Sequence, residues 1–264
     1  MRPNTLKSKL AAGHAASGCW LFTGSVSSAE ILAQCDFDAL IIDHEHSPGG
    51  LETMINQLRA IEPTPTTPLV RVAELSDSTV KLALDSGASG LLVANVETAF
   101  QVRDLMQAAT YPPAGRRGAH FTVSRASRWG LDSEAYWQDA RKELLLVAMI
   151  ESEAGVAAIP EMAREGGIDM FFVGPLDLSA SIGAMGQYTH PAFKELLAEA
   201  EQRILETGSW LGGATMPGHG LKELFSRGYR FATFTSDVAI LRDTAIALAS
   251  DASRVGATVL EGVA

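Results

Sequence analysis

Residues 145–153 read LLVAMIESE, and this stretch decides the fold class. Six apolar residues run without interruption, and a helical pattern follows over residues 153–164. A continuous apolar run is typical of a parallel strand that is covered on both faces, whereas a strand with one wet face alternates apolar and polar residues. The stretch therefore indicates one strand–helix unit of an α/β protein.

Seven more such units can be traced along the 264 residues. The other apolar runs cover residues 19–22, 39–42, 69–72, 91–94, 170–173, 210–214 and 231–234. Amphipathic segments lie between and after them, at residues 27–34, 51–61, 76–86, 96–109, 191–207, 220–226 and 236–250. A (β/α)8 TIM barrel takes about 250 residues, whereas an open doubly wound sheet usually has fewer strands. We therefore predict a single barrel domain over residues 1–264.

Composition excludes several classes of partner. The formal net charge is −10 and no Lys/Arg-rich run is present, so we expect no nucleic-acid partner. The longest notable apolar run, residues 144–150, is far below the ~20 residues of a membrane span, and residues 1–14 lack the apolar core of a signal peptide. Cys19 and Cys35 have no metal-ligand spacing and suit two thiols in a reducing compartment. We expect a cytoplasmic protein with no membrane partner.

In a (β/α)8 barrel the chemistry lies at the carboxyl ends of the strands. After the second apolar run come Asp43, His44, Glu45 and His46. An imidazole near a carboxylate is the arrangement of a general base that is held in one tautomer. The alternative is structural, with Asp43 capping the next turn and the other side chains in solvent.

Arg71 lies inside the apolar run of the third strand. A buried guanidinium needs an anionic partner, because an unpaired buried charge is costly. That partner is either a carboxylate of the protein, or a carboxylate or enolate oxygen of a substrate.

Two carboxylates follow neighbouring strands, Glu151 after the fifth and Asp177 shortly after the sixth. Carboxylates placed side by side repel unless a proton or a cation lies between them. Two carboxylates together with water and a chelating substrate commonly hold Mg²⁺ or Mn²⁺, and Co²⁺ or Zn²⁺ also fits. The structural alternative is that each residue caps a helix or a turn.

A cation site, an arginine and a His–carboxylate pair at one mouth together describe the stabilisation of an enolate. A Schiff-base mechanism is disfavoured, because it needs a desolvated lysine that faces the barrel centre. None of the six lysines follows the end of a predicted strand: Lys7, Lys9, Lys81, Lys142, Lys194 and Lys222.

Several segments together carry a family resemblance. They are residues 43–46 with the preceding run, 68–72, 111–118, 125–129, 150–151 and 174–179. On these segments the sequence resembles the HpcH/HpaI aldolase family, the class II pyruvate aldolases. The resemblance implies a divalent-metal-dependent lyase that forms or cleaves 4-hydroxy-2-oxo acids from pyruvate, or a related 2-oxo acid, and an aldehyde. It also implies a homo-oligomer, a trimer of dimers, in which we expect the C-terminal helix near residues 236–250 to pack on a neighbouring subunit.

The resemblance also implies a role for each site residue. Glu151 and Asp177 would bind the metal, and Arg71 would contact the ketone or enolate oxygen. His46, oriented by Asp43, would handle the proton of the aldol hydroxyl. Backbone N–H groups around Leu176 and Asp177, which follow Gly174 and Pro175, would hold the pyruvate carboxylate.

We expect the aldehyde pocket to be lined by the loop at residues 116–129, including His120, and by residues 211–215, including Leu211 and Gly212. The glycines at 212 and 213 either leave room for the aldehyde or allow close strand packing. Arg116 and Arg117 either recognise a distal carboxylate or are solvated, and we favour solvation for at least one of them.

The sequence departs from close relatives at three places. His44 stands where a smaller or apolar residue is common in the family it resembles, Met149 where a glutamine often precedes the metal glutamate by two positions, and His120-Phe121 where smaller residues are common. These changes bear on the substrate more than on the reaction class.

Two alternatives stay open. One is a related enolate lyase that acts on an acyl-CoA thioester, as citrate lyase β-like proteins do. The other is a non-catalytic barrel that only binds a 2-oxo acid.

Overall fold

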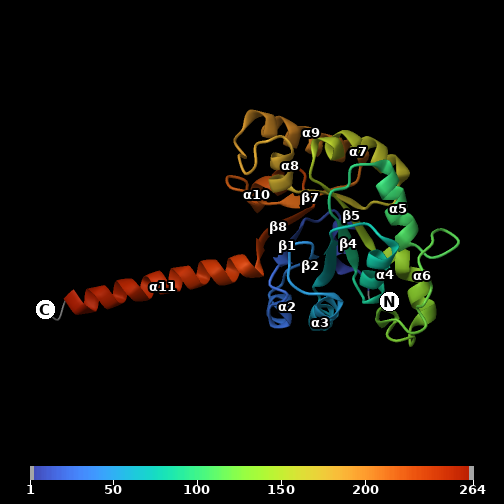
Figure 1. Ribbon diagram of the computed structural model, residues 1–264, viewed down its shortest axis with the longest axis horizontal. Coiled ribbons are helices and arrows are strands. Elements are labelled where there is room, and N and C mark those ends of the chain that lie inside the picture. Colours follow the sequence, from blue (N-terminus) through green and yellow to red (C-terminus); the bar gives the residue numbers. More distant parts are fainter. Residues whose placement is uncertain (1–2, 262–264) are drawn as a thin grey trace.

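The computed structural model describes residues 3–261 and contains a closed barrel of eight parallel strands in the order β1 to β8 (Figure 1). The strands are β1 Ala16–Leu21, β2 Ala39–His44, β3 Thr67–Val72, β4 Gly90–Val93, β5 Leu145–Ile150, β6 Met170–Val173, β7 Trp210–Ala214 and β8 Phe231–Ser236. The helices are α1 Thr5–Ala11, α2 Val26–Ala33, α3 Leu51–Ile61, α4 Asp77–Asp85, α5 Ala99–Ala109, α6 Ser133–Glu143, α7 Glu153–Glu165, α8 Pro175–Ser181, α9 Pro191–Thr207, α10 Leu221–Ser226 and α11 Asp237–Glu261, with a 3-10 turn η1 at Arg125–Ser127. The predicted fold class is confirmed.

The strands are apolar throughout because they separate two buried layers. Residues such as Ile41, Leu92 and Phe172 point into the barrel, where they form one packed cluster. Their neighbours, such as Leu40 and Phe171, point outward and pack against the surrounding helices. Side chains of a strand alternate between its faces, so both sets are apolar and the run is continuous.

Four helices begin after a hydroxyl residue that caps them. Ser25, Ser76, Thr98 and Ser152 each accept a hydrogen bond from the backbone N–H three residues ahead, which satisfies one unpaired amide of the first turn. Three helices were not predicted, α1, α6 and α8, because the first and last are only seven residues long and α6 is strongly polar.

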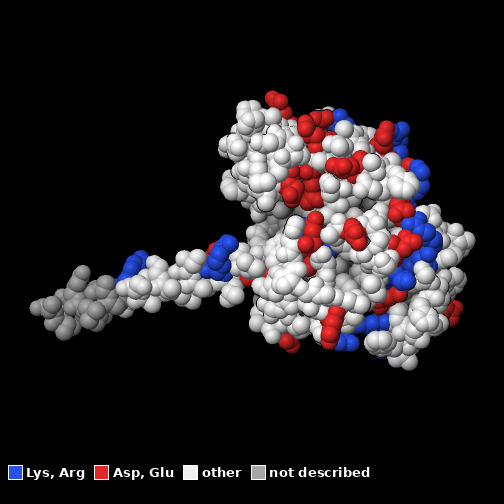
Figure 2. Space-filling view, viewed as in Figure 1, with Lys and Arg blue, Asp and Glu red and all other residues white. Residues whose placement is uncertain are grey.

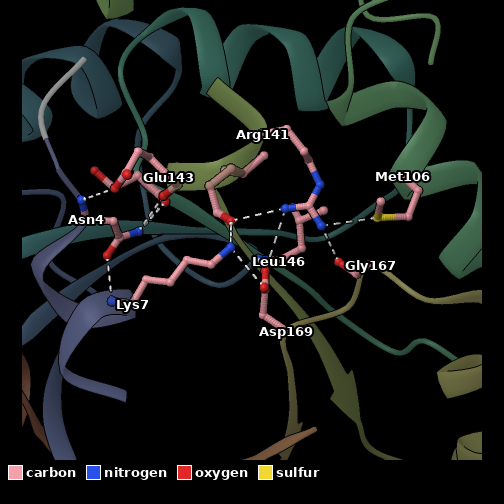
Figure 3. Close-up of polar contacts among 10 residues, drawn as sticks. Asn4, Lys7, Met106, Arg141, Glu143, Leu146, Gly167 and Asp169 are labelled. Atoms are coloured by element: carbon pink, nitrogen blue, oxygen red, sulfur yellow. Dashed lines mark hydrogen bonds and ion pairs between the residues drawn. The ribbon is translucent and has the colours of Figure 1, made fainter. Parts of the chain in front are cut away.

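Helix α1 closes the amino end of the barrel. Leu6 and Leu10 are each 1% exposed and join the inner cluster. Figure 3 shows the polar contacts that hold this helix: Lys7 Nζ lies 2.9 Å from Asp169 Oδ1 and donates to the Leu144 carbonyl at 2.7 Å. The other carboxylate oxygen of Asp169 accepts from the backbone N–H of Leu146 at 2.8 Å. One aspartate therefore joins α1 to the start of the fifth strand.

Helix α11 is unlike the other helices, because it leaves the barrel and extends into solvent (Figure 1). It runs for 25 residues, well past the predicted end at residue 250. No helix within residues 3–261 has both the length and the apolar composition needed to cross a membrane.

Replacing Asp169 with alanine should lower the free energy of unfolding by about 2 kcal/mol, because a part-buried amide and an ammonium lose their acceptor. Urea unfolding of both proteins measures the difference. Glu161→Ala is the control, since that side chain is 68% exposed and should change stability by less than about 0.5 kcal/mol. Equal stability of Asp169→Ala and the parent would show that the contacts of Asp169 do not contribute to holding α1.

Candidate active site

The carboxyl ends of β2, β3, β5 and β6 bring the predicted site residues together. Asp43 and Arg71 are register partners on adjacent strands. Ile150 and Val173 are partners on β5 and β6, so Glu151 and Gly174 follow at the same height. The barrel therefore brings Asp43 and Arg71 into the same mouth as Glu151, although these residues are far apart in the chain.

Arg71 is 6% exposed and is held by two carboxylates. Its Nε donates to Asp43 Oδ1 at 2.6 Å, and its Nη1 lies 3.1 Å from Glu45 Oε2. Nη2 makes no hydrogen bond to a described residue. The structure thus shows carboxylate partners of Arg71 within the protein, and the contact with a substrate oxygen stays a prediction.

Two aromatic side chains complete the surroundings of Arg71. Its Cζ lies 4.6 Å from the ring centroid of Trp20 and 5.9 Å from that of Phe22. The two rings stack at 5.5 Å with an interplanar angle of 8°. Sequence reasoning did not assign these residues to the site, although Trp20 and Phe22 have the two-residue spacing of one strand face.

Asp43 also organises the turn after β2. Its carboxylate accepts from the backbone N–H groups of Glu45 and His46 at 3.2 and 2.9 Å. Burial alone would raise the pKa of Asp43, but the hydrogen bond and charge of Arg71, together with these amides, bring the pKa below its usual value. Asp43 is therefore an anion at neutral pH.

The contact expected between Asp43 and the His46 imidazole differs in the structure. Asp43 reaches the backbone of His46, whereas the imidazole Nε2 lies 3.8 Å from Glu45 Oε2. The side chain of His46 is 66% exposed at the mouth. Asp43 thus positions His46 through the main chain, and Glu45 is the carboxylate beside its ring.

Glu151 is buried at 8% exposure, and its Oε2 accepts from the backbone N–H of Asn95 at 2.7 Å. Burial raises the pKa of Glu151 to about 7; the Asn95 amide lowers it, the negative charges of Asp177 and Glu45 raise it, and Arg71 lowers it. Its charge is therefore poorly compensated by the described residues.

Gly174 makes room for this glutamate. A Cβ at position 174 would lie 2.7 Å from Glu151 Oε1, which is too close for any side chain. Gly174 precedes α8, where Pro175 occupies the first position and lacks an N–H. The amides of Leu176 and Asp177 then belong to the unpaired first turn, and both side chains are exposed.

The loop assigned to the aldehyde pocket packs on the outer helices of its own barrel. Arg116 forms ion pairs with Asp77 at 2.7 Å and Asp104 at 2.6 Å, on α4 and α5. Arg117 is buried and pairs with Asp85 at 2.6 Å. Neither arginine is left free for a distal carboxylate. His120 is exposed on the same loop.

The assignment of Leu211 to the pocket is wrong. Its side chain is fully buried in the layer between strands and helices, so it faces away from the barrel interior. Gly212 does face the interior, but a Cβ there would lie 2.6 Å from Met170 Sδ. A Cβ at Gly213 would lie 2.6 Å from the Tyr229 ring, so both glycines serve close packing.

The unusual residues lie around the site. Met149 is 2% exposed and packs in the inner cluster beneath Glu151. His44 is half-buried, and burial lowers the pKa of its imidazole while the nearby Asp43 carboxylate raises it. Met149 makes the floor of the site apolar, and His44 stays neutral above its lowered pKa.

Glu45 and Asn95 were not assigned roles from the sequence. Glu45 stood within the Asp-His-Glu-His run, and pairs with Arg71. Asn95 follows β4 and has a positive φ of 47°, a conformation that asparagine adopts more readily than most residues. An asparagine directly after a barrel strand was the available signal.

Comparison with known proteins agrees with this geometry. The profile of the HpcH/HpaI aldolase/citrate lyase family matches residues 16–243. The chain is 34% identical over 247 residues to a hydroxypyruvate/pyruvate aldolase of Roseobacter denitrificans, covering 94% of this chain and 96% of that protein. It is 35% identical over 260 residues to a 4-hydroxy-2-oxo-heptane-1,7-dioate aldolase of Escherichia coli, covering 98% and 99%. A crystal structure of an HpcH/HpaI aldolase/citrate lyase family protein from Burkholderia cenocepacia has a TM-score of 0.88 at 33% identity, covering 94% of this chain and 98% of that one.

The chain belongs to the HpcH/HpaI aldolase family. The resemblance inferred from its motifs is thereby confirmed, and the protein is an aldolase, a carbon–carbon lyase. Divalent-metal dependence is a general property of the family.

The site of this HpcH/HpaI aldolase fits a divalent cation. Glu151 is a buried carboxylate whose pKa is raised by burial and by two neighbouring carboxylates, and a cation would relieve that repulsion. Within the described residues, no group of three or more His, Cys, Asp or Glu side chains is placed to hold a metal. Glu151 and Asp177 would therefore supply two ligands, and water and substrate oxygens the remainder.

The metal-free protein should lose stability as pH rises from 5 to 8, because the folded pKa of Glu151 lies above its unfolded value. The contribution of the Glu151 carboxyl to the free energy of unfolding is fully present below about pH 4.5 and is lost as the pH rises through 7, which lowers that free energy by about 3 kcal/mol. Glu151→Gln should match the parent at pH 5 and exceed its unfolding free energy at pH 8. Urea unfolding in EDTA measures both.

Glu153→Gln, at an exposed position two residues away, is the matched control and should follow the parent at both pH values. Adding Mg²⁺ at pH 8 should stabilise the parent more than Glu151→Gln. If Glu151→Gln were no more stable than the parent at pH 8 without metal, the raised pKa would be refuted.

Proposed function

We propose that this aldolase forms and cleaves 4-hydroxy-2-oxo acids through the enolate of pyruvate or a related 2-oxo acid, with an aldehyde as second substrate. The observation that carries the proposal is the buried Glu151, next to Asp177 and within the electrostatic reach of Arg71. The names of the relatives from R. denitrificans and E. coli support the same substrate class.

Mg²⁺ or Mn²⁺ is the proposed metal, because both protein ligands are carboxylates; Co²⁺ and Zn²⁺ also accept such ligands. Glu151 and Asp177 would hold it. When bound, the cation supplies Lewis-acid polarisation of the ketone oxygen of the substrate.

The chain's own residues orient the 2-oxo acid. The Nη2 edge of Arg71 would donate to the oxygen that becomes negative when a methyl proton leaves, since Nε and Nη1 are already engaged. The N–H groups of Leu176 and Asp177, in the first turn after Gly174 and Pro175, would bind the carboxylate.

His46 would move the proton of the aldol hydroxyl. Its imidazole is exposed at the mouth, and its backbone is held by Asp43. In the direction of synthesis it would assist protonation of the new alkoxide, and in cleavage it would accept that proton.

Assembly with copies of the same chain is part of the proposal. Leu241, Leu248 and Val255 on α11 are seven residues apart and 64–69% exposed, which is the apolar stripe of a helix that packs against another surface. Figure 2 shows α11 as a rod separate from the barrel. On β8, Phe234 points outward and is 43% exposed, where a barrel normally has a covering helix. We propose that α11 of one copy covers β8 of another within a trimer of dimers.

The loop with His120 fits the same assembly. Because it packs on the outside of its own barrel, we propose that it lines the aldehyde pocket of a neighbouring copy. The free thiols of Cys19 and Cys35 are compatible with the cytoplasmic location that we propose for the reaction.

A thioester lyase is the alternative within the family, whose description includes citrate lyase. Cleavage assays with 4-hydroxy-2-oxo acids on one side and malyl-CoA or citramalyl-CoA on the other separate the two. Cleavage of the thioesters alone would replace the proposal.

Incubation with pyruvate in D2O should exchange the methyl protons when Mg²⁺ or Mn²⁺ is present and not in excess EDTA, as followed by NMR. Asp177→Ala should abolish the metal-dependent exchange, and Arg71→Ala should slow it about 100-fold or more because a charge donor is lost. Both variants should keep the parent's circular dichroism. Arg164→Ala, a 75% exposed arginine on α7, is the control. Normal exchange in Arg71→Ala would refute the enolate role, and no exchange in the parent would favour the thioester lyase or a barrel that only binds.

Combined Leu241→Asp and Leu248→Asp substitutions should dissociate the assembly, because each places a charge in the apolar stripe at a cost of about 1–3 kcal/mol. Light scattering measures the mass in solution. Ser250→Asp adds the same charge on roughly the opposite face of α11 and should leave the mass unchanged. Retention of the parent's mass by the double variant would exclude this role of the stripe.

A further inference from the structure

We infer that Asp237, Phe22 and Trp20 form a positioning chain that sets the direction of the Arg71 guanidinium, and so links the first residue of α11 to the active site. The inference rests on the proposed role of Arg71 at the enolate oxygen. None of the three residues needs to touch a substrate for this role.

The first link is the contact of Arg71 with Trp20. The carboxylates of Asp43 and Glu45 bind Nε and Nη1 at the edges of the guanidinium. These edge contacts alone leave rotation about the Cδ–Nε bond weakly restrained. The Trp20 ring, 4.6 Å from Cζ, covers the face of the guanidinium and opposes that rotation. The ring therefore helps to determine where Nη2 points.

The second link fixes the tryptophan ring. Phe22 stacks on one face of Trp20 at 5.5 Å, and Phe172 meets the ring edge-on at 6.2 Å and 87°. Trp20 is 8% exposed, so it has little free space into which it could turn. Phe22 lies just beyond the end of β1, where the ladder with β8 no longer holds the backbone.

The third link replaces that missing ladder. The last register pair between β1 and β8 is Trp20 with Ser236. Beyond it, Asp237 accepts from the backbone N–H groups of Phe22 at 2.8 Å and Thr23 at 3.1 Å, and from the Thr23 hydroxyl. Asp237 is 4% exposed, and a buried carboxylate requires such donors.

The chain has a consequence for assembly. Asp237 is the first residue of α11, the helix that we propose to dock on a neighbouring copy. The same residue therefore fixes where α11 leaves the barrel and where Phe22 presents its ring to Trp20. A change at Asp237 should disturb the direction of Arg71 even when the copies stay associated.

Trp20→Leu tests the aromatic links. It should slow metal-dependent methyl exchange of pyruvate, and kcat for aldol cleavage, by about tenfold or more, the scale of loss expected from a misdirected group. Trp20→Phe should recover most of the rate. The affinity for Mn²⁺, measured by titration, should stay within about twofold of the parent, because Glu151 and Asp177 are untouched; a general collapse of the site would weaken it. Trp210→Leu, a partly buried tryptophan at the start of β7 and hence at the opposite end of the barrel, is the matched control.

Asp237→Asn tests the link to α11 with almost no change in volume. It should lower kcat several-fold with Mn²⁺ affinity and solution mass unchanged, since only the acceptor of Phe22 and Thr23 is altered. Asp243→Asn, an exposed aspartate on the same helix, should behave as the parent.

The outcomes separate the two ideas. If Arg71→Ala slows exchange while Trp20→Leu and Asp237→Asn keep the parent's kcat, the positioning chain is refuted and the proposed function stands. If Arg71→Ala itself exchanges normally, the role of Arg71 fails and the inference falls with it. Loss of Mn²⁺ affinity in Trp20→Leu to the same degree as kcat would also overturn the chain, because the effect would then be a general one.

Discussion

A guanidinium buried inside a barrel has to be neutralised and held, and the arrangement of this mouth follows from that need. Arg71 lies on an inward-facing position of β3, where it is 6% exposed. Asp43 and Glu45, at the end of β2, neutralise the guanidinium with their carboxylates, and aromatic rings cover its face. Asp43 also accepts a hydrogen bond from the backbone N–H of His46 in the following turn. Asp43 therefore holds both the Arg71 side chain and the backbone of His46. A single buried charge thus orders the side of the site at which we propose that His46 moves a proton.

On the other side of the mouth, around Glu151, negative charge is not fully compensated. Glu151 is buried among carboxylates, and its pKa is raised to about 7, so the described residues leave negative charge without full compensation. Gly174 lets this carboxyl approach β6, and the Asn95 amide fixes one of its oxygens. Arg71 has two carboxylate partners, whereas the charge of Glu151 is poorly compensated by the described residues, and both lie in the same mouth. If a cation joined the glutamate, the cation and Arg71 would both offer positive charge to the one oxygen of the developing enolate.

The barrel could be predicted from the sequence because its strands are apolar on both faces, and the same property explains what could not be predicted. A continuous run does not reveal which residue faces inward, and so Leu211 was placed in the pocket although its side chain packs against helices. Asp43, Arg71 and Glu151 could be assigned to the site, because a charged residue within or directly after an apolar strand is expected at the mouth of the barrel. The roles of Trp20 and Asn95 depend on contacts with residues 51 and 56 positions away, which local patterns do not contain. The position of the loop with His120 could not be predicted for a related reason: Arg116 finds its partners on α4 and α5, which only the folded chain brings near.

The end of the chain connects these local arrangements to assembly. A barrel closes only when the last strand meets the first, and here Asp237 extends that closure beyond the ladder by binding the backbone of Phe22 and Thr23. The chain then continues as α11, which turns away and leaves Phe234 on β8 43% exposed. A covering helix is needed at that face, and a second copy can provide one without any new element. Asp237 both binds the backbone just beyond β1 and is the first residue of α11. The direction of α11 and the position of the rings against Arg71 therefore depend on the same residue. In this proposal the Asp237 carboxylate aligns the guanidinium, whereas the apolar stripe of α11 holds the copies together.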